Sequence, residues 1–318
     1  MEYKHLSRRI QGFLTRIAIH ACFFVTKILP ERFVYRFAHQ FARVGYALAS
    51  RHRRVAFESL SIAFKNEKSQ QEIKEIAFGC FDSMAKSAIE FLAFLQRPDL
   101  IDRYVRVEGL QYLHQALEKK KGVIAASAHF GNFPLLLTAL ARKGYPVYSM
   151  LRVMRDPWVN EYFTKKRHEI GVGSIFTQPR KQCVTQSLEV LRNNRILFIQ
   201  LDQNFGTGGI FVDFFGRKAA TAKGSIVFAL RTHAPIVPMF IVREENNHQR
   251  IIIEPELPIV HGKDFNETIQ FTAQKITDII EGYVQRYPAE WSWIHRRWKA
   301  RPKEERENIN NTIKGGEL

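Results

Sequence analysis

The sequence has few cysteines, and they show no paired spacing. Cys22, Cys80 and Cys183 lie far apart along the 318 residues. This excludes a disulfide framework or a zinc knuckle and fits a reducing compartment. The 11 histidines are equally scattered, and no His-x-x-x-His pair falls on a predicted helix. We therefore expect no bound metal.

A long uninterrupted apolar run is also missing. The most apolar segment is a predicted helix from about residue 10 to 29, which three polar side chains interrupt: Arg16, His20 and Lys27. A membrane-spanning helix needs roughly 20 mostly apolar residues. We therefore expect residues 1–30 to form a monotopic or interfacial membrane anchor, with an amphipathic core helix as the alternative.

Acidic residues are scarce compared with basic ones. The 31 Asp and Glu against 48 Lys and Arg leave a formal net charge of +17. Such a charge favours an anionic partner, which can be nucleic acid, anionic lipid, a phosphorylated substrate or an acidic carrier protein. The sequence has no low-complexity basic tail and no recognisable nucleic-acid-binding module. Its 25 Phe, 10 Tyr and 4 Trp suit a membrane interface. We expect anionic membrane lipids, and not nucleic acid, as partners.

The order of the periodic segments predicts an α/β fold. Residues 31–95 are helical throughout, and apolar side chains recur there at helical spacing, as at Phe33, Phe37, Phe41 and Val44. From about residue 104 strands alternate with helices. We predict a mixed sheet flanked by helices on both faces, preceded by the N-terminal helical membrane-anchoring segment. The expected organisation is an anchor (1–30), one α/β domain with a helical N-terminal part (31–300) and a flexible basic and polar tail (301–318).

A predicted strand ends at His129. The uncharged run of small and β-branched residues at 123–128 predicts a strand that is buried on both faces. Gly131 breaks the run, and Pro134 suits the first position of a helix that stops at Gly144. His129 then lies at the carboxyl end of a strand and faces a helix N-terminus, where open α/β sheets bind ligands. The helix dipole there favours a neutral imidazole. The alternative is a turn histidine without a catalytic role.

Polar clusters fall at the predicted strand ends. They are His129 with Asn132, Arg152 with Arg155, and Asp202 with Gln203. Proton abstraction from a hydroxyl needs a neutral imidazole, a group that fixes its tautomer, and cations where negative charge gathers. Each cluster has a structural alternative: Asn132 can cap a helix, the arginines can be solvated, and Asp202 can organise the glycine-rich turn that follows it.

Blocks of the sequence occur in the order of a known family. They are residues 129–133, 152–157, 201–203 with 209–216, 220–221, 234–238 and 291–299. They resemble the blocks of the lipid A late acyltransferases, the lauroyl and myristoyl transferases of the lysophospholipid acyltransferase superfamily. The resemblance extends to about residue 299.

The resemblance implies a protein on the cytoplasmic face of the bacterial inner membrane. It would transfer a fatty acyl chain from acyl carrier protein, or from coenzyme A, to a hydroxyl of a glycolipid acceptor such as a Kdo-bearing lipid A precursor. The thioester is a co-substrate, and no cofactor is implied. His129 is the implied general base, matching the histidine of the family's His-x4-Asp/Glu motif. The candidate substrate-binding residues are Asn132, Arg152, Arg155, Arg167, Gln203 and Gly209.

One departure from the motif concerns its acidic position, which is Pro134 here. Proline can neither accept the imidazole N–H nor stabilise an imidazolium. Another carboxylate can serve, with Asp202 as the first candidate and Asp213 as the second, or His129 can act alone with lower activity. The alternatives are a non-catalytic lipid-binding protein on an acyltransferase fold, and acyl transfer to a different lipid acceptor.

The aromatic and basic block 291–299 allows two arrangements. Its tryptophans can pack on the core or dock at a membrane surface. We expect Trp291, Trp293 and Trp298 to pack inward, and Arg296 and Arg297 to contact lipid head groups.

Overall fold

The computed structural model describes residues 12, 16–17, 19–28, 30–65, 67–206 and 208–305. The end of the predicted tail, 306–318, and parts of the predicted anchor lie outside the described residues. The described residues 19–28 are helical. Among the helices that the structure describes, none is long and apolar enough to cross a membrane.

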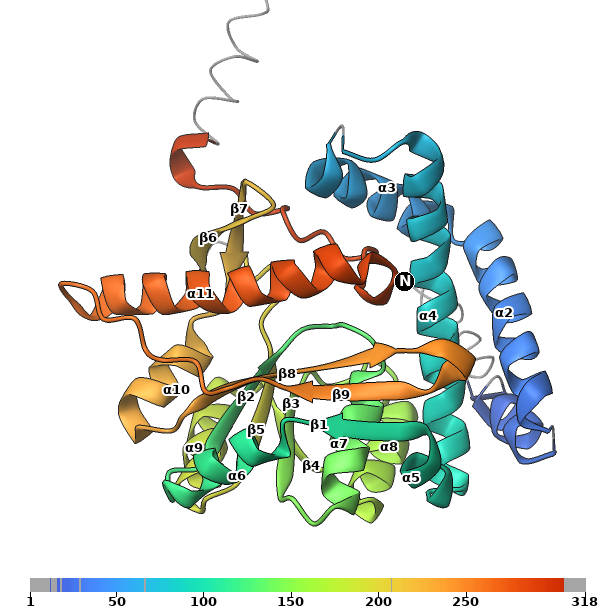
Figure 1. Cartoon of the computed structure of the whole chain (residues 1–318), viewed down its shortest axis with the longest axis horizontal. Helices are drawn as coiled ribbons and strands as arrows, with labels where there is room; N and C mark the ends of the chain where they lie inside the picture. The colour runs from blue at the N-terminus through green and yellow to red at the C-terminus, as the bar shows by residue number, and fades with distance from the viewer. Residues whose placement is uncertain are drawn as a thin grey trace, which may run out of the picture.

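A mixed sheet forms the centre of the described chain (Figure 1). Its seven strands lie in the order β1-β9-β8-β2-β5-β3-β4. They are β1 (Val105–Glu108), β2 (Val123–Ser127), β3 (Val147–Leu151), β4 (Gly173–Phe176), β5 (Ile196–Gln200), β8 (Ile236–Arg243) and β9 (Gln249–Ile253). Neighbouring strands run parallel except for the antiparallel pair β8 and β9. The predicted mixed sheet is confirmed.

Helices cover both faces of this sheet (Figure 1). The side chains of Ile124 and Ala126 enter one core cluster, and those of the alternate residues Val123 and Ala125 enter the other, as the two-residue period of a strand requires. The first cluster includes α9 (Arg180–Arg192), α10 (Gly224–Thr232) and α11 (Phe265–Arg286). The second includes α5 (Asp99–Tyr104), α6 (Leu110–Glu118) and α7 (Phe133–Arg142). Strand β2 is therefore buried on both faces, as its composition predicts.

A separate hairpin joins β5 to α10. Strands β6 (Ile210–Phe214) and β7 (Arg217–Thr221) pair antiparallel around Phe215 and Gly216, which both have positive φ, a geometry that matches the twist of a tight hairpin. Thr221 ends β7, and α10 begins at Gly224. The short run Arg-Lys-Ala-Ala-Thr of β7 carries no strong strand pattern in the sequence.

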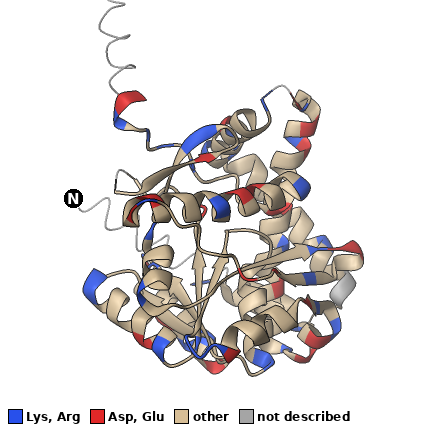
Figure 2. Ribbon diagram, turned by 60° about the vertical axis from the view of Figure 1, so that its left-hand side comes forward, with Lys and Arg blue, Asp and Glu red and all other residues tan. Residues whose placement is uncertain are grey.

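The N-terminal helices form a layer beside the sheet. They are α2 (Glu31–Leu48), α3 (Ser50–Phe64) and α4 (Gln70–Gln96). A capping box begins α4: the Ser69 hydroxyl accepts from the backbone N–H of Glu72, whose carboxylate accepts from the backbone N–H of Ser69. Helix α2 lies on the side of α4 that faces away from the sheet (Figure 1). Lys and Arg are distributed over many helices, strands and loops and are not concentrated in one segment (Figure 2).

Candidate active site

Two neighbouring strands bring His129 and Asp202 together. Strands β2 and β5 are paired in parallel, with Ser127 opposite Gln200. His129 and Asp202 each lie two residues beyond these partners, so they emerge at the same sheet edge. The backbone N–H of Leu201 donates to the carbonyl of Ser127 at 2.9 Å, which extends the pairing into the site. This is the edge at which ligands bind in open α/β sheets.

The two side chains form a hydrogen-bonded pair. Nδ1 of His129 lies 2.9 Å from Oδ1 of Asp202, and the backbone N–H of His129 donates to Oδ2 at 2.9 Å. The Asp202 side chain is 2% exposed, whereas that of His129 is 29% exposed. A carboxylate on Nδ1 holds the proton on that nitrogen, so the imidazole can use Nε2 as a base.

Asp202 has a third donor in Trp291, whose indole N–H reaches Oδ2 at 2.8 Å. Burial alone would raise the pKa of Asp202. The charge of His129 and the hydrogen bonds from His129 and Trp291 outweigh burial and lower its pKa below the ordinary value. Asp202 is therefore an ionised, oriented carboxylate at neutral pH.

Asn132 caps α7, which is the structural alternative left open by the sequence. Its Oδ1 accepts from the backbone N–H of Leu135 at 3.2 Å, and its side chain is fully buried. The helix begins at Phe133, so Pro134 occupies its second position and not its first. That position also lies within the first turn, where backbone N–H groups lack partners in the helix. Asn132 thus has a structural role at the start of α7.

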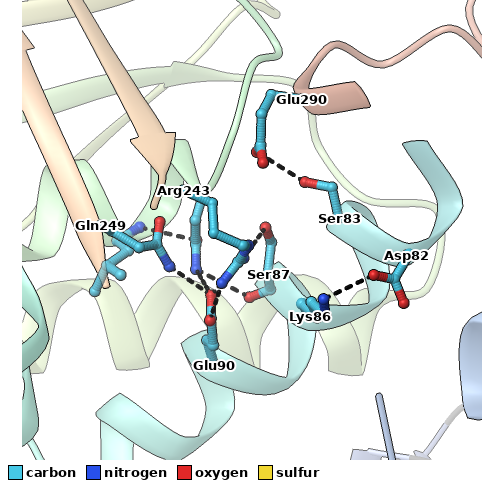
Figure 3. A network of polar contacts seen from close by, with 10 residues as sticks. Asp82, Ser83, Lys86, Ser87, Glu90, Arg243, Gln249 and Glu290 are labelled. Carbon is cyan, nitrogen blue, oxygen red and sulfur yellow. Dashed lines mark hydrogen bonds and ion pairs between the residues drawn. The ribbon is translucent and has the colours of Figure 1, made fainter. Parts of the chain in front are cut away.

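A buried polar network around Glu90 holds the Asn132 side chain, and Figure 3 shows Glu90 with Arg243 and Gln249. Glu90 on α4, 2% exposed, is ion-paired with Arg243 at the end of β8. It also accepts from Gln249 Nε2 at 2.6 Å and from Asn132 Nδ2 at 2.9 Å. The start of α7 is therefore fastened to α4 and to the antiparallel strand pair. Glu90 was not identified from the sequence because it is one acid in a long amphipathic helix.

The C-terminal block 291–299, together with Glu290 just before it, holds the loop that carries His129. The backbone N–H of Gly131 donates to the carbonyl of Glu290 at 2.8 Å, and that of Ser292 donates to the carbonyl of His129 at 3.1 Å. Gly131 has φ +55°, and a Cβ there would meet the backbone carbonyl of Ile241. This position requires glycine because its backbone has a positive φ and because it packs directly against the backbone of Ile241.

The same block holds the turn that carries Asp202. Nε2 of His295 accepts from the backbone N–H of Asn204 at 2.8 Å, and Nη1 of Arg297 donates to the carbonyl of Gln203 at 3.3 Å. Burial lowers the pKa of His295 to about 4, with contributions from the charges of His129, Arg297 and Arg152 and opposition from Asp202. His295 is therefore neutral at pH 7, as an acceptor of an N–H must be.

Arg297 corrects one prediction for this block. It is 1% exposed, and its guanidinium donates to the carbonyl of Ala220 at 2.6 Å and to the hydroxyl of Thr221 at 2.5 Å. Burial lowers its pKa to about 10. A contact with lipid head groups is excluded by this position. The inward packing of the tryptophans is confirmed: Trp291, Trp293 and Trp298 are all buried.

The predicted arginines lie in different surroundings. Arg152 and Arg155 are exposed, just beyond β3 at the same sheet edge, and the charge of Arg152 acts on His295. Arg167 lies on α8 (Pro157–Glu169) and is half-buried, with hydrogen bonds to Ser174 and Thr164 at 3.0 Å. Desolvation lowers the pKa of Arg167. Of these three arginines, Arg152 is the one whose charge acts on His295 beside the pair.

The remaining candidate residues also lie in different surroundings. Gln203 adjoins Asp202 and is half-buried, and Gly209 opens the β6 hairpin, where a Cβ would crowd the carbonyl of Thr221. Asp213 is exposed on β6 and ion-paired with Lys218 at 2.9 Å. Asp202, and not Asp213, is therefore the carboxylate beside His129. In the described part of the chain, no group of three or more His, Cys, Asp or Glu is arranged to hold a metal ion.

Comparison with known proteins identifies the class and the family. A family model described as bacterial lipid A biosynthesis acyltransferase matches residues 2–300. The lipid A biosynthesis lauroyltransferase of Escherichia coli (strain K12) is 23% identical over 91% of this chain and 92% of its own. The palmitoleoyltransferase of the same strain is 24% identical over 79% and 80%. The phosphatidylinositol mannoside acyltransferase of Mycolicibacterium smegmatis (strain ATCC 700084 / mc(2)155) is 22% identical over 63% and 64%.

The α/β fold, the His–Asp pair and these relatives define an O-acyltransferase. The match over nearly the whole chain then places it more narrowly: this protein belongs to the bacterial lipid A biosynthesis acyltransferase family. The recognition made from the sequence blocks is confirmed.

Proposed function

We propose that this protein is a membrane-associated acyltransferase that moves a fatty acyl chain from acyl carrier protein, or from coenzyme A, to a hydroxyl of a glycolipid such as a lipid A precursor. The observation that carries this proposal is the 2.9 Å contact between His129 Nδ1 and Asp202 Oδ1 at the ligand-binding edge of the sheet. A buried carboxylate beside a partly exposed imidazole is the arrangement that general-base catalysis needs.

The proposed reaction uses His129 and no covalent enzyme intermediate. Nε2 of His129 takes the proton of the acceptor hydroxyl as its oxygen attacks the thioester carbonyl carbon. The C–O bond of the new ester forms, and the C–S bond then breaks. The proton passes from the imidazolium to the leaving thiolate, so the histidine returns to its neutral state. Asp202 stabilises the imidazolium in between.

Asp202 takes over the role of the carboxylate that the motif places where this chain has Pro134. A helix that begins at Phe133 accommodates proline without losing a hydrogen bond within the helix. Asp202 reaches the imidazole from β5, with its second oxygen held by Trp291. We therefore propose that His129 and Asp202 form a complete catalytic pair, in which the carboxylate comes from position 202 and not from the motif's acidic position at 134.

The arginines supply positive charge for an anionic substrate. We propose that Arg152 and Arg155, exposed beyond β3, contact phosphates of the acceptor or of the acyl donor. Arg167 contributes through its half-buried position next to β4, and Gln203 and Gly209 shape the substrate side of the turn. The net charge of +17 also suits an acidic carrier protein and anionic lipids.

The acceptor has a second candidate. The relatives named for lipid A biosynthesis and the relative named for phosphatidylinositol mannoside act on different glycolipids. The cytoplasmic face of the bacterial inner membrane follows as the proposed location, because a lipid A precursor would be met there. The division into an anchor at 1–30, a catalytic domain at 31–300 and a tail at 301–318 remains part of this proposal.

The test is acyl transfer to a total lipid extract, from a mixed acyl carrier protein pool and separately from acyl coenzyme A, followed by mass spectrometry. We expect one lipid class to gain a single acyl mass, and His129→Ala to abolish this gain. A lipid A precursor as the product supports the first acceptor, and a mannolipid product supports the second. Wild-type protein that binds vesicles but transfers no acyl group from either thioester would contradict the proposal.

A further inference from the structure

Helix α2 carries its large apolar side chains on the outside. Phe41, Val44 and Leu48 are 53%, 56% and 79% exposed, respectively. The inner face of α2 packs on α4 and carries Val34, Ala38 and Ala42, which are at most 4% exposed. A surface helix of a globular protein normally has the reverse pattern. The outward face of α2 is therefore built for an apolar environment other than the core.

The exposed apolar residues form one stripe together with Phe37, which is half-buried and also packs against the inner face of α2. Phe33, Phe37, Phe41, Val44 and Leu48 follow each other at steps of three and four residues, the spacing that aligns side chains along one helix face. At about 1.5 Å per residue the stripe is roughly 22 Å long. Phe37 stacks on Phe41 at 6.5 Å between ring centroids. A stripe of this kind along the helix axis suits a helix that lies in the plane of an interface and does not cross it.

The charged side chains beside the stripe are all basic. Residues 33–48 contain Arg36 and Arg43 and no acid, and both arginines are exposed. Helix α3 then begins with a basic cluster in which Arg51 and Arg54 are exposed. Exposed aromatic and aliphatic side chains between arginines match the boundary between acyl chains and anionic head groups.

We propose that the outer face of α2, with the start of α3, is the surface by which this protein docks on an anionic membrane. A second copy of the chain is a poorer occupant, because pairing two α2 stripes would bring arginines together with no acid on that face to neutralise them. The inference deepens the proposed function, since it names the surface that brings the enzyme to its lipid acceptor.

The experiment compares two variants of the full chain in vesicle co-sedimentation. Phe41→Asn with Val44→Asn removes two members of the stripe, and Phe271→Asn on α11, another exposed phenylalanine (41%), is the matched control. On vesicles of phosphatidylglycerol and phosphatidylcholine, we expect the double variant to partition at least about tenfold more weakly than wild type. The control variant should bind as wild type does.

A second variant tests the charge. Arg36→Gln with Arg43→Gln should weaken binding to the phosphatidylglycerol vesicles at low salt and leave binding to pure phosphatidylcholine unchanged. Acyl transfer to detergent-dispersed acceptor should be unchanged in both double variants, so loss of docking is distinguishable from loss of the proposed activity. Vesicle binding at wild-type strength by the Phe41/Val44 variant would overturn the inference. A wild-type dimer that this variant dissociates would overturn it as well.

Discussion

The indole N–H of Trp291 donates a 2.8 Å hydrogen bond to Oδ2 of Asp202, which leaves Oδ1 of the same carboxylate for His129 Nδ1 at 2.9 Å. One carboxylate oxygen thus accepts from the Trp291 indole, and the other contacts the His129 imidazole. Because the backbone N–H of His129 also donates to Oδ2, the carboxylate cannot turn without losing several hydrogen bonds. The orientation of the imidazole is therefore set by residues from three separate parts of the chain.

Replacing Asp202 by Asn should lower kcat by about 10²- to 10⁴-fold with little change in KM. An amide can donate to Nδ1 and favour the wrong tautomer, and it cannot stabilise an imidazolium. The measurement is steady-state acyl transfer, with thermal unfolding to verify that the variant is folded. Because Asp202 has a lowered pKa, it stays ionised in wild type throughout the neutral range, and its own titration should not limit the rate there.

Asp213→Asn is the matched control for Asp202→Asn. Asp213 is exposed and paired with Lys218 on the hairpin, and surface ion pairs contribute little. We expect its kcat to stay within about twofold of wild type. If the Asp202 variant retained activity at that level, His129 would be working without a carboxylate partner.

Arg297→Met should lower the free energy of unfolding by about 2 to 4 kcal/mol. The substitution keeps the volume roughly constant but removes the donors to Gln203, Ala220 and Thr221. The neighbouring Arg296 is exposed, so Arg296→Met should change stability by less than about 0.5 kcal/mol. Chemical denaturation of both variants measures the difference. Equal effects would mean that the buried guanidinium is not what holds the turn after β5.

His295 should make the protein less stable as the pH falls from about 6.5 to about 4. The folded-state pKa of His295 is lowered to about 4. Between these values the unfolded chain therefore binds a proton that the folded chain does not, and stability falls with pH. After allowing for solvent screening, the contribution is about 1 kcal/mol between pH 7 and pH 5.

His295→Gln is the variant that isolates this effect. Glutamine can still accept from the backbone N–H of Asn204 but does not titrate, so the variant should lose less stability than wild type between these two pH values. His261→Gln, at an exposed histidine, should follow the wild-type curve. The explanation fails if the two variants show the same dependence on pH.

The site was predictable from the sequence to the extent that it depends on strand ends. His129 and Asp202 both follow apolar strands, and parallel strands place their carboxyl ends at one edge. That β2 and β5 are neighbours is a property of the strand order, which periodicity does not determine. Asp213 therefore remained a second candidate until the structure placed it on a separate hairpin.

Helix α2 and Arg297 show that a sequence pattern does not determine which side chains are buried. Spacing indicates which residues share a helix face, but not whether that face meets the core or the solvent. In α2 the small residues Ala38 and Ala42 pack inward and Phe41 faces outward. Arg297 is buried although neighbouring Arg296 is exposed, because the carbonyls that bind it come from strand ends that are distant in the sequence.

Gly131→Ala should be among the most damaging single substitutions outside the catalytic pair, with a loss of about 3 to 5 kcal/mol and a matching loss of activity. The backbone at Gly131 has φ +55°, and a Cβ there would meet the backbone carbonyl of Ile241. The loop must then move, and it carries His129. Gly144 also has positive φ, +86°, but has open space around a Cβ, so Gly144→Ala should cost only about 1 kcal/mol of backbone strain. Thermal unfolding and kcat of the two variants separate the strain that they share from the steric conflict that only Gly131 has. A similar cost for both would mean that the β8 backbone yields, and that the position of the His129 loop does not depend on this contact.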